Sequence, residues 1–189
     1  MPAFQIKWPW IVLGIVVVLL LWVVAAYNGL VTSHENVDTQ WANVQAVYQR
    51  RMDLIPNVVS TVKGAANFEQ GTMIAVTEAR TKWMSGGSRS EQIGAAQEFD
   101  SALSRLLVTV ESYPQLKATE AFRDLTTELE GTENRIAVAR RDFNEAVQSY
   151  NLKVKRFPGA LIAGMFGFGP EAFFQADSGA DKAPIVDFQ

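Results

Sequence analysis

Cysteine is absent from the 189 residues, and histidine occurs once, at His34. Without cysteine the chain has no disulfides, no thiolate metal sites and no cysteine nucleophile. With one histidine it has no multi-histidine metal site and lacks the usual general base elsewhere. Lysine and arginine number 17 against 20 acidic residues, so positive charge for binding nucleic acid is not in excess. The composition excludes cysteine chemistry and disfavours most other familiar catalysis and nucleic-acid binding, without indicating a function.

Charge is also missing between Trp8 and Tyr27, where nearly every residue is apolar. Twenty helical residues rise about 30 Å, the thickness of a hydrocarbon core. Aromatic residues lie near both ends of the run, where rings favour the headgroup level. The sequence therefore predicts a short segment over residues 1–7 and a transmembrane helix over residues 8–27. The alternative is a signal peptide cleaved after Ala26, although signal cores are shorter, about 7–15 residues.

Few basic residues flank the predicted span. Lys7 precedes it, whereas no lysine or arginine occurs between Asn28 and Gln49. Because basic residues stay on the cytoplasmic side, this asymmetry predicts a cytoplasmic N-terminus and an exported main domain on the inner membrane.

Helical periodicity dominates the chain after the span. Thr32 with Glu35, and Ser88 with Glu91, have the spacing of capping boxes and predict two helix starts. Apolar residues then recur at spacings of three and four, as expected for the buried faces of helices. We predict an all-α fold: a transmembrane helix, then an elongated antiparallel bundle of about four helices over residues 28–157.

The predicted stripes fall into four groups. They are Val37, Trp41, Val44, Tyr48 and Ile55; Val58, Val62, Ala65, Val76, Ala79 and Trp83; Ala96, Phe99, Leu103, Leu106, Val110 and Tyr113; and Ala118, Phe122, Leu125, Leu129, Thr132, Ile136, Ala139, Phe143, Ala146, Tyr150 and Phe157. The last group keeps its phase across Gly131, which predicts one helix over residues 118–157.

Pro56 interrupts the first helical region. Proline has no backbone donor and disfavours helical geometry at the preceding residue, so we predict a kink or a break near Ile55. Neighbouring side chains are interpreted as stabilising the kink by bonding freed carbonyl groups, with a docking surface as the alternative. These neighbours are Arg50, Arg51, Asp53 and Asn57.

The tail over residues 158–189 is rich in glycine and phenylalanine. It is predicted to be irregular, with an extended end at APIVDFQ. Its phenylalanines are candidates for membrane or partner contact, and packing on the chain's own bundle is the alternative. They are Phe166, Phe168, Phe173 and Phe174.

No motif assigns a catalytic residue, a cofactor site or a metal site. Glu130 and Glu133 have the i, i+3 spacing of carboxylates in di-iron bundles, but the accompanying Glu-x-x-His elements are missing. Hydrolysis of sugars needs only two carboxylates, so a carboxylate-based hydrolase stays open as an alternative.

Several blocks closely resemble the LemA family. They are YNGLV, QWANV, QRRMDLIPNVVSTVKG, ARTKW, VESYPQLKA, ENRIAVARRDFNEAV and YNLKVKRFPG. The resemblance implies a membrane-anchored helical bundle of bacterial envelopes with no known catalytic activity. It also implies HtpX-type membrane metalloproteases or other envelope proteins as partners.

The sequence thus predicts a scaffold or adaptor held in the lipid bilayer, without a cofactor or chemistry of its own. We expect it to act through protein–protein interaction or as a homo-oligomer. The alternatives are an envelope hydrolase and a membrane-remodelling protein that uses the aromatic tail.

Overall fold

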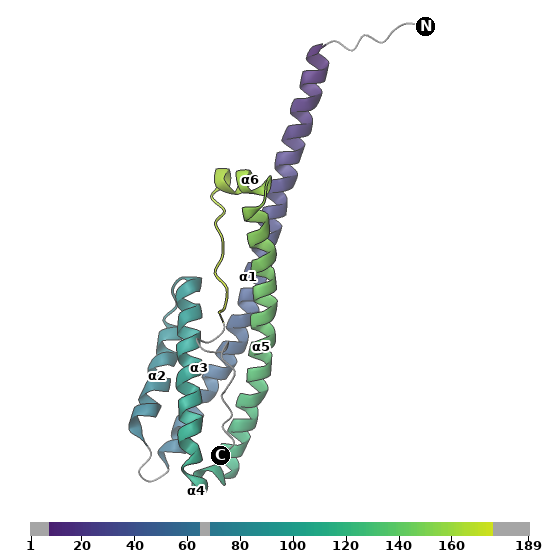
Figure 1. The fold of residues 1–189 in the computed structure, drawn as a ribbon. Coiled ribbons are helices and arrows are strands. Elements are labelled where there is room, and N and C mark those ends of the chain that lie inside the picture. Colours follow the sequence, from purple (N-terminus) through teal and green to yellow (C-terminus); the bar gives the residue numbers. More distant parts are fainter. Residues whose placement is uncertain (1–7, 65–68, 176–189) are drawn as a thin grey trace, which may run out of the picture. The chain divides into compact units, whose positions relative to one another are not determined.

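A computed structural model describes residues 8–64 and 69–175, which form helices and connecting segments without a strand (Figure 1). The helices are α1 (Trp8–Lys63), α2 (Gln70–Met84), α3 (Arg89–Glu111), α4 (Pro114–Lys117), α5 (Glu120–Lys155) and α6 (Gly159–Phe166). The prediction of an all-α protein is confirmed for this part of the chain.

The chain divides into two compact units. Among the described residues, the anchor unit comprises 8–41 and 143–171, and the core unit comprises 42–64, 69–142 and 172–175. Helices α1 and α5 therefore contribute residues to both units.

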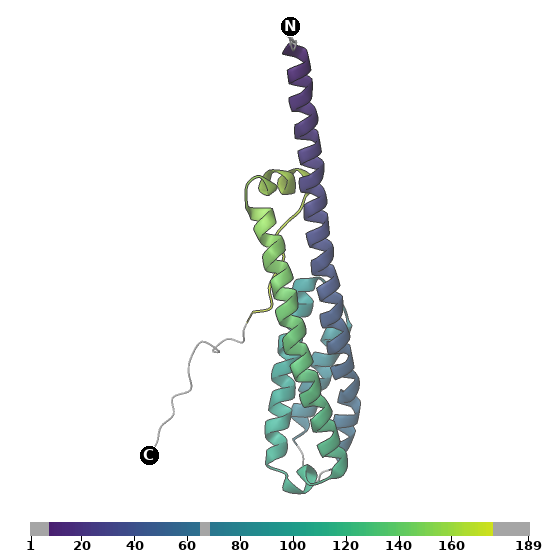
Figure 2. The ribbon, with the colours of Figure 1, turned by 90° about the vertical axis from the view of Figure 1, so that its right-hand side faces the viewer.

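Helix α1 begins in the apolar run and continues without interruption to Lys63 (Figure 2). It is long and apolar enough to cross a membrane, and the side chains of its apolar run are exposed, as at Leu20 (60%) and Leu21 (65%). The predicted helix start at Thr32 is wrong: Thr32 lies within α1, and its hydroxyl donates to the carbonyl of Asn28 at 2.9 Å. A helix already under way has no orphan N–H groups for a capping box to satisfy.

Of the kink or break predicted near Ile55, the break does not occur, because α1 passes through Pro56. The interruption comes later, since α1 ends at Lys63 and α2 begins at Gln70. The stripe predicted from Val58 to Trp83 is therefore divided between two helices. Ala65, one of its members, lies outside the described residues.

Most of the predicted apolar stripes form the buried core. Five residues differ from the prediction: Tyr113, Leu125 and Ala139 are half-buried, and Ala118 and Phe157 are exposed, Phe157 to 82%. Tyr113, Ala118 and Phe157 lie outside the helices that their stripes occupy, because α3 ends at Glu111 and α5 spans only Glu120–Lys155. Leu125 and Ala139 lie within α5. The long helix predicted over residues 118–157 is thus shorter at both ends, but it does continue through Gly131.

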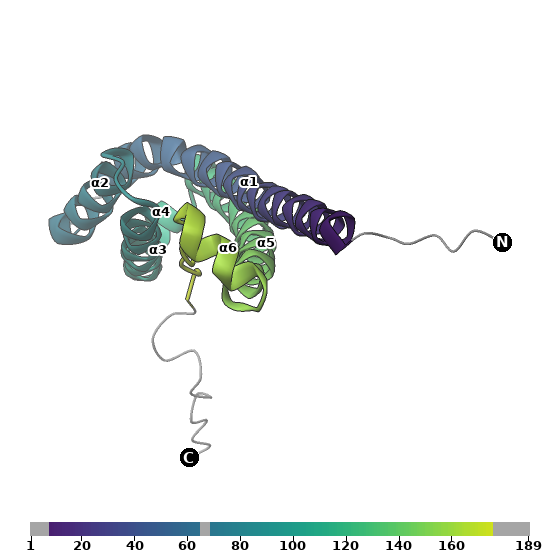
Figure 3. The same cartoon turned by 90° about the horizontal axis from the view of Figure 1, so that it is seen from above.

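Helices α2 and α3 lie side by side within the core unit (Figures 1 and 3). The turn between them contains Gly86 and Gly87 at φ values of 77° and 120°, where a residue with a Cβ atom is strained. The predicted capping box then starts α3, because the Ser88 side chain accepts from the Glu91 backbone and the Glu91 carboxylate accepts from that of Ser88.

The predicted irregular tail contains a helix, α6, at its start. This helix ends at Gly167, whose φ of 77° is left-handed, and the Phe168 N–H donates to the Ala163 carbonyl at 2.9 Å. Residues 167–175 then follow without regular structure. The APIVDFQ segment, predicted to be extended, lies outside the described residues.

Candidate functional site

Arg51 is buried in the core unit, whereas its neighbour Arg50 is exposed. The Arg51 Nη1 atom lies 3.3 Å from Asp100 Oδ1 on α3 and 2.5 Å from Glu133 Oε2 on α5. This arginine therefore joins three helices of the core unit through its guanidinium group. The sequence predicted that Arg51 stabilises a kink at Pro56 by bonding freed carbonyl groups, but its side chain contacts residues on α3 and α5.

Asp100 and Tyr48 complete the site together with Arg140. The Tyr48 hydroxyl donates to Asp100 Oδ2 at 2.8 Å, and Arg140 Nη2 donates to both the Tyr48 oxygen and Asp100 Oδ2. We call this set the arginine cluster; it comprises Tyr48, Arg51, Asp100, Glu133 and Arg140. Its two arginines and two carboxylates balance in formal charge.

Burial is the largest single influence on the pKa values of Asp100, Tyr48 and Arg140. It raises the pKa of Asp100, although Arg140, the Tyr48 hydroxyl and Arg51 each favour the ionised form. The pKa of Tyr48 is also raised, first by burial and then by the charge of Asp100. For Arg140, burial lowers the pKa, but Tyr48 and Asp100 outweigh it and the net direction is upward. The hydroxyl of Tyr48 therefore stays protonated and serves as a hydrogen-bond donor.

Phe174 covers one side of the arginine cluster and is itself 6% exposed. Its ring stacks on that of Tyr48, with centroids 6.5 Å apart and planes 6° from parallel. The Arg140 guanidinium lies 5.0 Å from the Phe174 ring and 5.4 Å from the Tyr48 ring, within the range of cation–π attraction. Phe174 therefore packs on the chain's own core, whereas the adjacent Phe173 is exposed.

A cavity of about 990 Å³ adjoins the arginine cluster between α3 and α5. Asp100, Glu133, Arg51 and Arg140 all contribute to its lining. The two carboxylates lie within about 6 Å of each other, because both contact the same Arg51 nitrogen at 3.3 and 2.5 Å. Among the described residues, no group of three or more histidine, aspartate or glutamate side chains is arranged to hold a metal ion.

Pro56 leaves the carbonyl of Met52 without its usual helical donor, because that donor would be the missing N–H of the proline. The Nε atom of Arg80, on α2, donates to this carbonyl at 3.0 Å. A freed carbonyl is thus satisfied, as the sequence suggested, but by a residue that the prediction did not name. Asp53 accepts from Gln49 at 2.8 Å, and the Asn57 carbonyl accepts from Ser60 and Thr61 at 2.9 Å.

We expect Arg80→Met to lower the free energy of unfolding by about 1–3 kcal/mol, because it leaves a buried carbonyl unpaired. Pro56→Ala restores an N–H donor for the Met52 carbonyl. Arg80→Met should therefore lower the free energy of unfolding much less when Pro56 is also replaced by alanine. Lys82→Met, on the exposed side of α2, is the control and should cost under about 1 kcal/mol. Thermal unfolding of the full chain in detergent, followed by circular dichroism, measures all four variants. An equal loss at Arg80 in both backgrounds would refute this assignment.

In the anchor unit, His34 lies between two carboxylates. Its Nδ1 atom is 3.4 Å from Asp38 Oδ2, and its Nε2 atom is 3.3 Å from Glu171 Oε1. The Asn151 side chain bonds both the N–H and the carbonyl of Glu171, at 2.8 and 2.9 Å. The segment after α6 is thereby fixed to α1 and α5 within this unit.

Phe166 and Phe168 also belong to the anchor unit. Their rings lie 4.8 and 5.9 Å from the ring of Tyr27, at the end of the apolar run. Phe166 remains half exposed and Phe168 is half-buried. The four phenylalanines predicted as candidates for membrane or partner contact are therefore divided, with Phe173 and Phe174 in the core unit.

The described structure defines an all-helical protein whose first helix carries a long exposed apolar run and whose charged centre is paired internally. A model of the LemA family matches residues 40–188, and the chain belongs to the LemA family. The chain is 28% identical to Magnetosome protein MamQ 2 of Paramagnetospirillum magneticum, with 85% of this chain and 68% of the relative covered. It is 25% identical to Protein LemA of Metamycoplasma hominis, with 79% and 68% covered.

Proposed function

We propose that this protein is a membrane-anchored helical scaffold or adaptor of the bacterial cell envelope, with no chemistry of its own. The exposed apolar run of α1 carries the proposal. Leucine and valine side chains exposed over some twenty residues have a favourable environment in lipid, where a helix also satisfies its own backbone groups. The same helix then continues into the core unit, so the anchor and the domain share one continuous backbone.

The arginine cluster supports a structural role for the charged centre. Each carboxylate in it contacts an arginine, and the charged groups come from α1, α3 and α5. Groups held in such pairs fix the arrangement of helices and are poorly placed to exchange protons with a substrate. The relatives named as magnetosome proteins favour a membrane-associated role.

The proposed mechanism is geometric. An anchor confines the domain to the membrane plane and so raises the effective concentration of partners there. We propose a second copy of the chain, or an envelope protein such as an HtpX-type metalloprotease, as the partner. The proposed orientation has the N-terminus in the cytoplasm and the domain on the exported side of the inner membrane. A reporter fused after Gln189 tests the orientation.

We expect the chain to resist alkaline carbonate extraction from membranes and to form a specific oligomer or complex. Light scattering after size exclusion in detergent gives the number of copies, and crosslinking in native membranes with mass spectrometry identifies neighbours. A soluble, strictly monomeric chain with no reproducible neighbour would refute the scaffold proposal.

A carboxylate-based envelope hydrolase is the second candidate, favoured by the cavity beside Asp100 and Glu133. Their separation of no more than about 6 Å is compatible with a retaining mechanism, and burial raises the pKa of Asp100, as a general acid requires. Arg51, however, contacts both carboxylates. Incubation with cell-wall polysaccharide distinguishes the candidates: a hydrolase turns over the substrate and loses turnover in Asp100→Asn and Glu133→Gln, whereas a scaffold shows no turnover.

Membrane remodelling through the aromatic tail is disfavoured by the burial of Phe174 on Tyr48. A variant lacking residues 159–175 tests this candidate. If the tail remodels membranes, the variant should bind liposomes less well than the full chain, and unchanged binding would rule the candidate out.

A further inference from the structure

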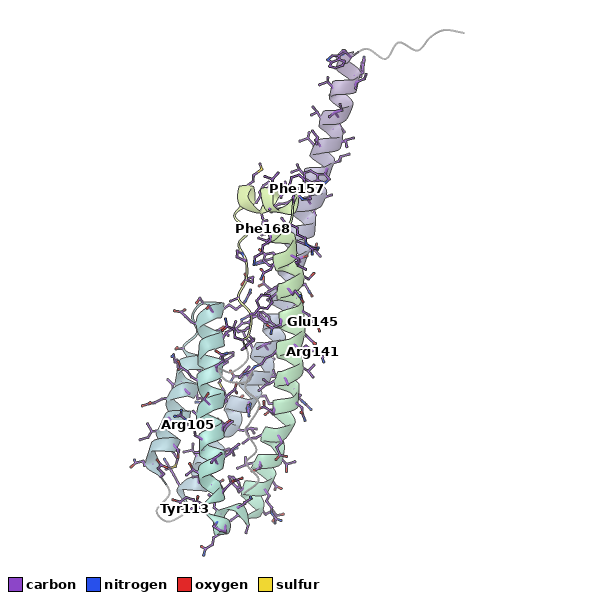
Figure 4. All side chains as sticks on the ribbon, viewed as in Figure 1. Arg105, Tyr113, Arg141, Glu145, Phe157 and Phe168 are labelled. Carbon is purple, nitrogen blue, oxygen red and sulfur yellow. The ribbon has the colours of Figure 1, made fainter. Side chains whose placement is uncertain are left out.

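A cavity of about 330 Å³ lies in the anchor unit where the apolar run of α1 ends. Trp22 and Ala26 of α1 line it, together with Leu152 of α5 and Phe157 just after that helix. Figure 4 shows Phe157 at the corner between α5 and α6, next to α1. The cavity thus has apolar surface on both sides and lies at the end of the segment proposed to cross the membrane.

Two cations also line this cavity. The Lys153 ammonium donates to the Ser33 hydroxyl and to the Gly29 carbonyl, the latter at 3.3 Å, and both acceptors are uncharged. The Arg156 guanidinium makes no ion pair with another residue in the described part of the chain. Two positive charges therefore line an apolar cavity without a carboxylate from residues 8–64 or 69–175 to neutralise them.

Helix α6 marks the expected depth of the cavity relative to the bilayer. The Tyr27 ring packs against Phe166, the last residue of α6, with centroids 4.8 Å apart. Helix α6 has no charged residue, and its Leu161 and Met165 side chains are exposed. An exposed apolar helix beside the end of a membrane span is expected to lie at the boundary between the lipid headgroups and the acyl chains.

We propose that this cavity binds the headgroup of an anionic phospholipid. The phosphate contacts Arg156 and Lys153, and an acyl chain follows the apolar surface of Trp22 and Phe157. The inference rests on the proposed membrane anchor and adds a lipid preference to it. Arginine and lysine are suited to phosphate, and the apolar wall beside them favours a ligand that also carries an apolar chain.

Basic residues in the last turn of a helix also complement its dipole, which is the simplest other explanation for this cluster of cations. Lys155 lies in the same turn of α5, but it does not line the cavity. It therefore serves as a matched control: dipole compensation and general attraction to an anionic surface involve Lys155 as much as Arg156, whereas a lipid site does not.

The test uses the full chain in mild detergent with phosphatidylglycerol or phosphatidylcholine of the same acyl chains, and native mass spectrometry counts the bound lipid. We expect a preference for phosphatidylglycerol that falls about tenfold or more in the double variant Lys153→Gln/Arg156→Gln, since each basic contact with an anionic headgroup is worth about a fivefold change. Arg156→Gln alone, at an exposed position, should show part of the loss. Lys155→Gln should retain the preference.

Equal binding of the two lipids, or the same loss in Lys155→Gln as in the double variant, would overturn the proposal. Displacement of phosphatidylglycerol by inorganic phosphate would assign the site to a free anion and would also overturn it. Carbonate extraction of the same variants separates this result from failure of the anchor. If the anchor fails, every variant is released from the membrane; if only the lipid site fails, the chain stays in the membrane without a lipid preference.

Discussion

Arg140→Met is expected to lower the free energy of unfolding of the full chain by about 3 kcal/mol at neutral pH. The substitution keeps the apolar stem but leaves Asp100, with its side chain 20% exposed, without one of its two arginines. Removal of one partner from a buried pair costs about 3–5 kcal/mol, and the partial exposure of this pair favours the lower end of that range. Thermal unfolding followed by circular dichroism should show a decrease in Tm of about 6–12 °C.

Arg141 provides the matched control. It is adjacent in sequence, but its side chain is 64% exposed and it contacts Asp142 at 3.0 Å. Arg141→Met should change the free energy of unfolding by less than about 1 kcal/mol, the usual range for exposed pairs. An equal loss at both arginines would contradict a specific role for the arginine cluster.

The cost of Arg140→Met should depend on pH. Burial already raises the pKa of Asp100, and removal of Arg140 takes away the strongest influence that lowers it. A carboxyl group whose pKa is higher in the folded than in the unfolded chain contributes most stability below its unfolded pKa, about 4, and loses that contribution as pH rises through the folded pKa. The difference in unfolding free energy between parent and variant should therefore be smallest near pH 4 and widen toward neutrality. Asp100→Asn should partly rescue Arg140→Met at pH 7, whereas a gap independent of pH would contradict this account.

Most of the helical core could be predicted from apolar spacing alone. Val37, Val44 and Phe99 are buried as predicted, because repeats of three and four residues place side chains on one face of a helix. Ser88 and Glu91 were also predictable, since a capping box depends only on residues close in sequence. The helix start predicted at Thr32 and the break allowed at Pro56 do not occur, because both residues lie within one long helix.

The arginine cluster could not be predicted, because its partners are far apart in the chain. Asp100 and Arg51 are 49 positions apart, and Arg140 and Tyr48 are 92 apart. One signal was nevertheless present: Tyr48 belongs to a buried stripe, and a buried tyrosine hydroxyl usually has a hydrogen-bond partner. Arg80 was missed for a related reason, because the proline identifies the carbonyl that lacks a donor but not the helix that supplies one.

Phe143→Ala is expected to lower the free energy of unfolding by about 3–5 kcal/mol, the usual cost of removing a fully buried ring. Phe143 is fully buried, and its ring centroid lies 5.3 Å from that of Trp41 within the anchor unit. Val138→Ala, an exposed position on the same helix, is the control and should cost less than about 0.5 kcal/mol.

Phe143→Leu separates loss of packing from loss of the aromatic contact. Leucine retains much of the buried volume but not the ring that faces Trp41, so its cost should lie between those of Val138→Ala and Phe143→Ala. Guanidinium unfolding of the full chain in detergent measures the three variants on one scale. Helix α5 supplies both Phe143 and Arg140. We expect Phe143→Ala and Arg140→Met each to lower the free energy of unfolding strongly at neutral pH, but only the effect of Arg140→Met to depend on pH. That difference would separate apolar packing from charge pairing along a single helix.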